Sequence, residues 1–320
     1  MCIALISTVH PDYSLILLDN RDEFLNRPTA KAEWWPAPHS KVLGGRDLLR
    51  DTQGTWLGIS KDGRIAVLTN FREDVTPPPT AVSRGAIIRK FLTEDIGTTE
   101  EFVESVIKTG VAKDAGGFSL VCGRVGEKLA VVSNRAEDQS QVPWIAGDIV
   151  QTVGLSNAAF TNRTWKKVND GEELMLDAIR ASIETQETED ELIKRFLQLL
   201  SRDTLPRKEE NNHGGLDTYI NQLRNTILVP ALGRKDRSSL PPDEIAAARQ
   251  NERAEVLNDA ALKQAKQLGF SGLYGTQKQA VILVDRKRRV RFFERTLYDN
   301  DSSSVPTGQG DVDIEFEIER

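Results

Sequence analysis

The chain has 320 residues, of which 39% are hydrophobic and 28% charged, with a formal net charge of −6. This composition is ordinary for a folded domain, and the acidic balance argues against a general nucleic-acid or anionic-membrane binder. Two cysteines cannot build a disulfide framework, and three histidines are too few for a His-rich metal site.

The first two apolar runs, which start at Cys2 and Tyr13, predict a β-hairpin around the turn-like tripeptide 10–12. A hairpin returns the end of its second strand to the start of its first, so Arg21 and Asp22 should lie beside Cys2. There an arginine can hold a thiolate or orient a carboxylate substrate, and an aspartate can hold an ammonium group. The alternative interpretation is a solvated polar loop with one salt bridge.

Cys2 follows the initiator methionine, which methionine aminopeptidase normally removes before so small a residue. The mature chain would then begin with a residue that carries both a thiol and a free α-amino group. Their unperturbed pKa values are about 8.5 and about 8, so the amine can take the thiol proton, as in N-terminal-nucleophile enzymes. The alternative is a small apolar residue packed in the first strand.

Strands, then helices, then further strands are predicted along the rest of the chain. Helices are expected at 84–92, 99–109, 172–184 and 189–200. Strands are expected at 64–69, 118–125, 129–134, 226–229, 280–284, 290–293 and 314–318. The basic residues 286–289 fall between two of these strands and predict a charged hairpin tip. Two antiparallel sheets covered by helices on their outer faces satisfy this order.

We expect a single domain over residues 1–320. Polar insertions are predicted near 206–215 and 234–253, and a flexible stretch near 300–310. No run approaches the ~20 consecutive apolar residues of a membrane span, and the N-terminus lacks the features of a signal or transit peptide. The default expectation is therefore a cytoplasmic protein.

A series of short motifs begins with Met-Cys-Ile at the N-terminus and Leu-Asp-Asn-Arg-Asp-Glu-Phe at 18–24. Further landmarks follow in order at Arg27-Pro28, Trp34-Trp35, 44–47, 54–58, 68–72, 83–85, 154–157 and 274–276. With these motifs, over about residues 1–295, the chain resembles the NRDE family, whose animal member is the transport and Golgi organization protein 2. This resemblance implies an α+β fold, the four-layer αββα sandwich of N-terminal-nucleophile hydrolases that choloylglycine and penicillin V acylases share.

The resemblance also implies roles for particular residues. In these acylases an asparagine after a small hydroxyl residue helps to form the oxyanion hole, and Ser156-Asn157 matches that pattern; the alternative is a turn asparagine that ends a strand. Asn70 is a second candidate donor. Related sequences often have arginine where this chain has Gln277, and Lys278 is an imperfect substitute because it lacks the planar guanidinium.

Two functions remain open. In one, the chain is a factor in Golgi organisation, protein secretion and lipid or haem trafficking that binds a hydrophobic ligand in the N-terminal-nucleophile-type cleft. In the other, it is a cysteine hydrolase of a linear amide or thioester, with Cys2, Arg21, Asp22 and Asn157 as catalytic residues. Either function requires no cofactor, although transient haem or acyl-CoA binding is compatible with the family. Association with the Golgi or mitochondria is compatible with it too, and the oligomeric state stays open.

By chemistry alone, the candidate axial ligands for haem are His10, Cys2 and Cys122. The chain has no c-type haem attachment motif. Under either function the expected partner is a hydrophobic or amide-containing small molecule, and no nucleic-acid partner is expected.

Overall fold

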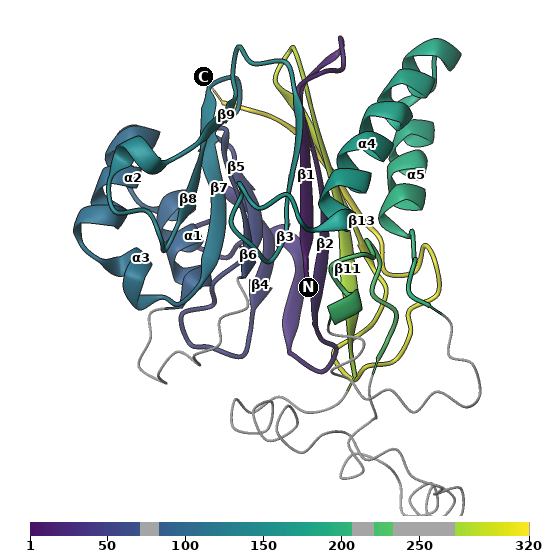
Figure 1. Cartoon of the computed structure of the whole chain (residues 1–320), viewed down its shortest axis with the longest axis horizontal. Helices are drawn as coiled ribbons and strands as arrows, with labels where there is room; N and C mark the ends of the chain where they lie inside the picture. The colour runs from purple at the N-terminus through teal and green to yellow at the C-terminus, as the bar shows by residue number, and fades with distance from the viewer. Residues whose placement is uncertain (71–82, 207–220, 233–272, 320) are drawn as a thin grey trace, which may run out of the picture.

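Two antiparallel sheets face each other in the protein (Figure 1). The computed structural model describes residues 1–70, 83–206, 221–232 and 273–319. Apart from Pro206, the polar insertions expected at 206–215 and 234–253 lie outside the described residues.

One sheet has six strands and the other has seven, and all pairings are antiparallel. The six, in spatial order, are β10 (Thr152–Leu155), β1 (Ile3–Ser7), β2 (Tyr13–Phe24), β11 (Tyr274–Asp285), β12 (Arg289–Thr296) and β13 (Val312–Glu317). The seven are β3 (Thr29–Trp34), β4 (Val42–Asp47), β5 (Leu57–Ser60), β6 (Arg64–Asn70), β7 (Phe118–Arg124), β8 (Lys128–Ser133) and β9 (Trp144–Ala146).

Helices cover the outer face of each sheet (Figure 1). The seven-stranded sheet carries α1 (Arg84–Thr93), α2 (Thr99–Lys108) and α3 (Val111–Asp114), and a short 3₁₀ helix, η1 (Gln139–Gln141), follows β8. The six-stranded sheet carries α4 (Lys166–Thr185) and α5 (Glu189–Leu200). The expected four-layer αββα sandwich is therefore confirmed.

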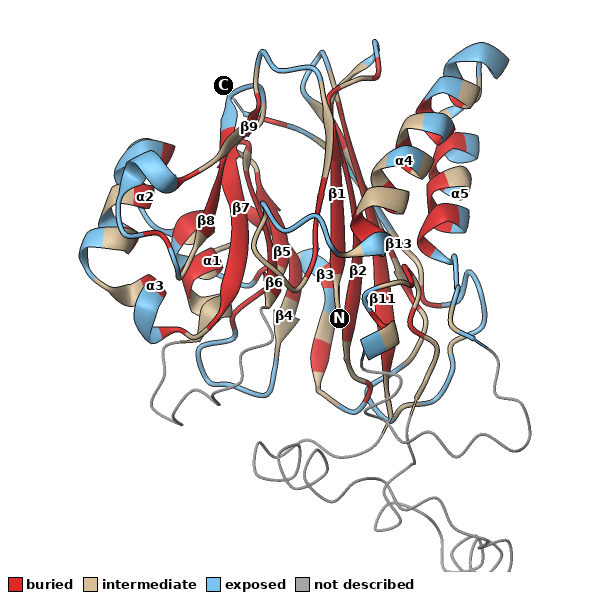
Figure 2. Ribbon diagram, viewed as in Figure 1, coloured by how far each residue is buried: buried red, intermediate tan, exposed pale blue. Residues whose placement is uncertain are grey.

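Three apolar clusters hold the four layers together, one between the sheets and one under each group of helices. Successive side chains of a strand point to opposite faces, so a central strand must be apolar on both. In β2, Leu17 packs between the sheets and Leu18 packs under α4 and α5. Figure 2 accordingly shows buried strands and helices whose outward sides are exposed.

The N-terminal hairpin forms as the sequence predicts. Its register pairs Ile3 with Asn20 and Ser7 with Ile16. The expected helices 99–109 and 189–200 also form, and each begins with a capping box, Thr98 with Glu101 in α2 and Thr188 with Glu191 in α5. The basic tip at 286–289 joins β11 to β12 as expected.

One predicted strand and one predicted helix boundary were wrong. The segment 226–229 is no strand. The Thr226 hydroxyl donates to the Leu228 carbonyl within the segment, and the Val229 N–H donates to the Thr276 hydroxyl, next to the bulge of β11. Helix α4 begins at Lys166 instead of at 172, because its polar first turn is held by the bond from the Lys167 N–H to the Arg224 carbonyl. No amphipathic pattern marks that turn in the sequence.

Among the helices in the described parts of the chain, we find none long and apolar enough to span a bilayer.

Candidate functional site

The hairpin places Cys2 against the backbone of Asp22. The thiol donates to the Asp22 carbonyl oxygen at 3.5 Å, and the Asp22 N–H donates to the sulfur at 3.4 Å. This contact continues the ladder in which Ile3 faces Asn20. The expectation that Cys2 lies beside the end of β2 agrees with this geometry.

The Asp22 side chain meets the chain's α-amino group. The Met1 ammonium nitrogen lies 3.1 Å from Oδ2 of Asp22 and also hydrogen-bonds the Tyr274 hydroxyl. The other carboxylate oxygen accepts from the Thr276 hydroxyl at 2.6 Å. A buried carboxylate thus holds the amine next to Cys2, with β11 supplying its support.

A buried lysine completes this group. Lys167 lies in the first turn of α4, is fully buried, and donates from Nζ to the Met1 carbonyl oxygen. The Ser156 hydroxyl donates to the next carbonyl, that of Cys2, at 2.5 Å. Sequence reasoning missed Lys167, because one lysine in the stretch Thr-Trp-Lys-Lys carries no distinguishing pattern.

Burial dominates the electrostatics of this site. It raises the pKa of the Cys2 thiol to about 11, and the neighbouring ammonium group offsets only part of this effect. Burial also lowers the pKa of the Met1 amine and of Lys167, while Asp22 opposes both shifts. With Met1 in place, the thiol is therefore protonated and weakly nucleophilic at neutral pH.

Arg21 is engaged by other groups. Its guanidinium lies 4.4 Å from the centroid of the Trp56 ring and hydrogen-bonds Gln277, which is fully buried and donates to the Leu25 carbonyl at 3.1 Å. Stacking on an aromatic face stabilises a desolvated guanidinium. Gln277 thus serves as the hydrogen-bond acceptor for Arg21.

Lys278 is engaged by Glu294 and not by Cys2. Its ammonium group lies 2.9 Å from the Glu294 carboxylate, and both side chains are almost completely buried. The same carboxylate oxygen accepts from the Ala32 N–H at 2.8 Å. Because Ala32 belongs to β3, this ion pair ties the six-stranded sheet to the seven-stranded one.

Asn157 follows the end of β10 closely, and its side chain contacts the end of β6. Its amide nitrogen donates to the Asn70 carbonyl, and the Ser156 carbonyl accepts from the Thr69 hydroxyl at 2.7 Å. A side-chain amide has two N–H groups, so one remains for a ligand oxygen. The Asn70 side-chain oxygen is buried and has no hydrogen-bond partner within the part of the chain that the structure describes.

Asp19 adds a further buried carboxyl group. One of its oxygens has no hydrogen-bond partner among the described residues, and burial followed by the nearby Asp22 charge raises its pKa well above the usual range. Desolvation and a neighbouring negative charge both favour the protonated form of a carboxyl group.

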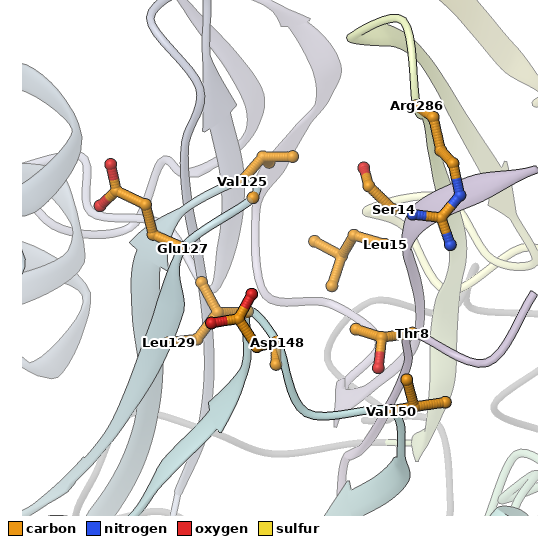
Figure 3. Close-up of a pocket in the computed structure, with 12 residues that line it drawn as sticks. Thr8, Ser14, Leu15, Val125, Glu127, Leu129, Asp148, Val150 and Arg286 are labelled. Carbon is orange, nitrogen blue, oxygen red and sulfur yellow. The ribbon is translucent and has the colours of Figure 1, made fainter.

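A cavity of about 350 Å³ lies at the opposite end of the sandwich. In Figure 3 Arg286 lies on one side of it and Glu127 and Asp148 on the other. Thr8 and Leu15, which also line it, sit at the end of the hairpin remote from Cys2. Neither His10 nor Cys122 lines this cavity, and Cys122 is buried in the core under α1 and α2.

No group of three or more His, Cys, Asp or Glu side chains suited to a metal ion occurs in the ranges that the structure describes.

Comparison with known proteins identifies relatives over nearly the whole chain. A family model described as Transport and Golgi organisation 2 matches residues 1–299. The Transport and Golgi organization 2 homolog of Mus musculus is 29% identical over 300 residues, covering 92% of this chain and 91% of the mouse protein. The Homo sapiens homolog is 28% identical with the same coverage. Among solved structures, the Caenorhabditis elegans N-acylethanolamine-hydrolyzing acid amidase ortholog matches with a TM-score of 0.42 at 14% identity, over 65% of this chain and 88% of that one.

Proposed function

The chain belongs to the Transport and Golgi organisation 2 family, and from that premise we propose that it acts in Golgi organisation and protein secretion through acyl chemistry at Cys2. The reaction is hydrolysis of a linear amide or thioester. Cys2 is the nucleophile and its own α-amine the base once Met1 is removed. Asp22 holds that amine, and Asn157 donates to the developing oxyanion. Arg21 stays a structural neighbour of the nucleophile, since Trp56 and Gln277 engage it.

The observation that carries this proposal is the contact of Asp22 with both the Cys2 thiol and the N-terminal ammonium group, which in this structure belongs to Met1. The Asp22 backbone holds the Cys2 sulfur, and the Asp22 carboxylate lies 3.1 Å from the Met1 ammonium nitrogen. After Met1 is removed, the Cys2 amine becomes the N-terminal amine, and we propose that Asp22 then holds it in the same way. An amine so held can accept the thiol proton and return it to the leaving group.

A second candidate is a carrier that binds an acyl-CoA, another lipid or haem without turning it over, in the cytoplasm or at Golgi or mitochondrial membranes. The engagement of Arg21 by Gln277 favours it, because a guanidinium committed in this way is not available to a thiolate or a substrate carboxylate. The raised thiol pKa points the same way.

Intact-mass analysis of the native protein, before and after treatment with an activated acyl ester, tests the proposal. We expect the mass of a chain without Met1 and one acyl adduct, located on Cys2 by peptide mapping. Cys2→Ser should keep its melting temperature and lose the adduct, whereas the matched variant Cys122→Ser should keep the adduct. Full complementation of a null strain by a stable Cys2→Ser protein would instead support the carrier.

A further inference from the structure

Lys167 is a fully buried cation that the catalytic assignment above does not use. Its backbone is fixed by the bond from its N–H to the Arg224 carbonyl at 3.1 Å, and its ammonium nitrogen lies 5.9 Å from the centroid of the Trp165 ring. Its ammonium group donates a hydrogen bond to the Met1 carbonyl oxygen. A lysine so deeply buried needs a partner, because an unpaired charge away from water is costly.

The acceptor of Lys167 belongs to the residue that must leave before Cys2 can act. The Met1 carbonyl carbon is bonded directly to the Cys2 nitrogen, so Lys167 aims its donor at a carbonyl group one bond from the nucleophilic residue. Removal of Met1 takes this oxygen away and leaves the ammonium group beside Cys2 and Asp22, the two residues whose charges act on it most. The space that Met1 leaves is thus bordered by a buried hydrogen-bond donor.

We propose that the Met1 carbonyl occupies the place of the substrate's acyl carbonyl, and that Lys167 is a further catalytic residue that donates to the substrate oxygen. The inference deepens the proposed function and rests on it. Asn157 supplies less there, because one of its N–H groups is committed to the Asn70 carbonyl. The substrate class is an acyl compound whose carbonyl oxygen gains charge during attack, an amide or a thioester.

The Cys2 sulfur forms a bond to the acyl carbon, the carbonyl π electrons move to oxygen, and Lys167 donates to that oxyanion. The thiol proton passes to the Cys2 amine and then to the leaving amine or thiol, as the bond to that group breaks. Water attacks the resulting thioester, which releases a carboxylic acid and restores the thiol.

Acylation compared with alkylation of Cys2 separates this role from a merely structural one. Attack on an activated acyl ester passes through an oxyanion, whereas alkylation by iodoacetamide does not. Both reactions require the thiolate, so a change in thiol ionisation slows them equally. Both rates are measured by intact mass on chains that lack Met1.

We expect Lys167→Met to slow acylation about 100-fold, the usual effect of removing one oxyanion donor, and to change alkylation less than about 3-fold. Lys166→Met, one residue away and exposed in its pair with Asp170, should change neither rate. If Lys167→Met does not fold, Lys167→Gln is measured in the same way. An equal loss in both reactions, or no loss in either, would overturn the assignment of Lys167 while leaving acyl chemistry at Cys2 intact. A wild-type Cys2 that is alkylated but never acylated would refute the proposed function and this inference together.

Discussion

The Met1 ammonium nitrogen and the Asp22 carboxylate form a buried ion pair at 3.1 Å, across the end of the first hairpin. This contact fixes the start of β1 to the end of β2 on the face that α4 covers. It also explains why Cys2 is held by the Asp22 backbone and not by the Asp22 side chain, since the carboxylate is already occupied by the amine and by Thr276.

Asp22→Asn should destabilise the protein and slow acylation of Cys2. Removing one partner of a buried ion pair costs about 3–5 kcal/mol, because the other charge stays buried without compensation. We expect a clear drop in the denaturant midpoint, with the presence of Met1 recorded by intact mass. Asp12→Asn, in the exposed turn of the same hairpin, is the control, and an Asp22→Asn midpoint equal to it would contradict the prediction.

Asp19 should make stability depend on pH. Burial raises its folded-state pKa above the value near 3.8 of an unperturbed aspartate. The folded protein therefore holds this proton to higher pH than the unfolded chain does, and the contribution of this group to the free energy of unfolding falls as pH rises above about 4 through the folded pKa.

Asp19→Asn removes this titration. We expect the melting temperature of the variant to exceed that of the wild type by about 2–4 °C at pH 8, the shift that ~1 kcal/mol produces. Near pH 4 the two proteins should melt together. A wild-type advantage at pH 8 would show that the ionised Asp19 carboxylate has a partner that stabilises it.

Gln277→Arg should destabilise this chain. Gln277 is fully buried and accepts from Arg21, so the change brings two guanidinium groups together away from water. We expect a fall in melting temperature of about 5 °C or more. Gln277→Glu, which offers Arg21 a carboxylate of nearly the same size, should cost less, and an order reversed between the two variants would refute this account of Arg21.

The single variant Lys278→Met should lose more free energy of unfolding than the double variant that combines Lys278→Met with Glu294→Leu. The single change leaves the Glu294 carboxylate buried without its cation, which costs about 3–5 kcal/mol. Removing both charges eliminates most of this penalty, apart from the lost hydrogen bond to the Ala32 N–H. Urea denaturation of the two single variants and the double variant measures the coupling energy between Lys278 and Glu294. If the losses in free energy of unfolding of the two single variants simply add up in the double variant, the prediction is contradicted.

Pattern and capping chemistry were sufficient to predict the hairpin, the capped helices α2 and α5, and the proximity of Cys2 to Asp22. These features depend on residues close in sequence, where strand alternation and capping boxes act locally. The sequence could also suggest the four layers, because strands such as β2 are apolar on both faces and the amphipathic helices need a sheet to cover.

Only the tertiary structure decided what the polar residues of the site do. Lys167 looked like an ordinary polar side chain, and Gln277 and Lys278 drew notice only as replacements for an arginine. Their partners Met1, Arg21 and Glu294 lie on other elements of the fold. The sequence shows which groups can ionise. Whether each is neutral, paired or poised for a ligand depends on burial and on partners that meet only when distant segments pack together, because desolvation and nearby charges set the pKa of a buried group.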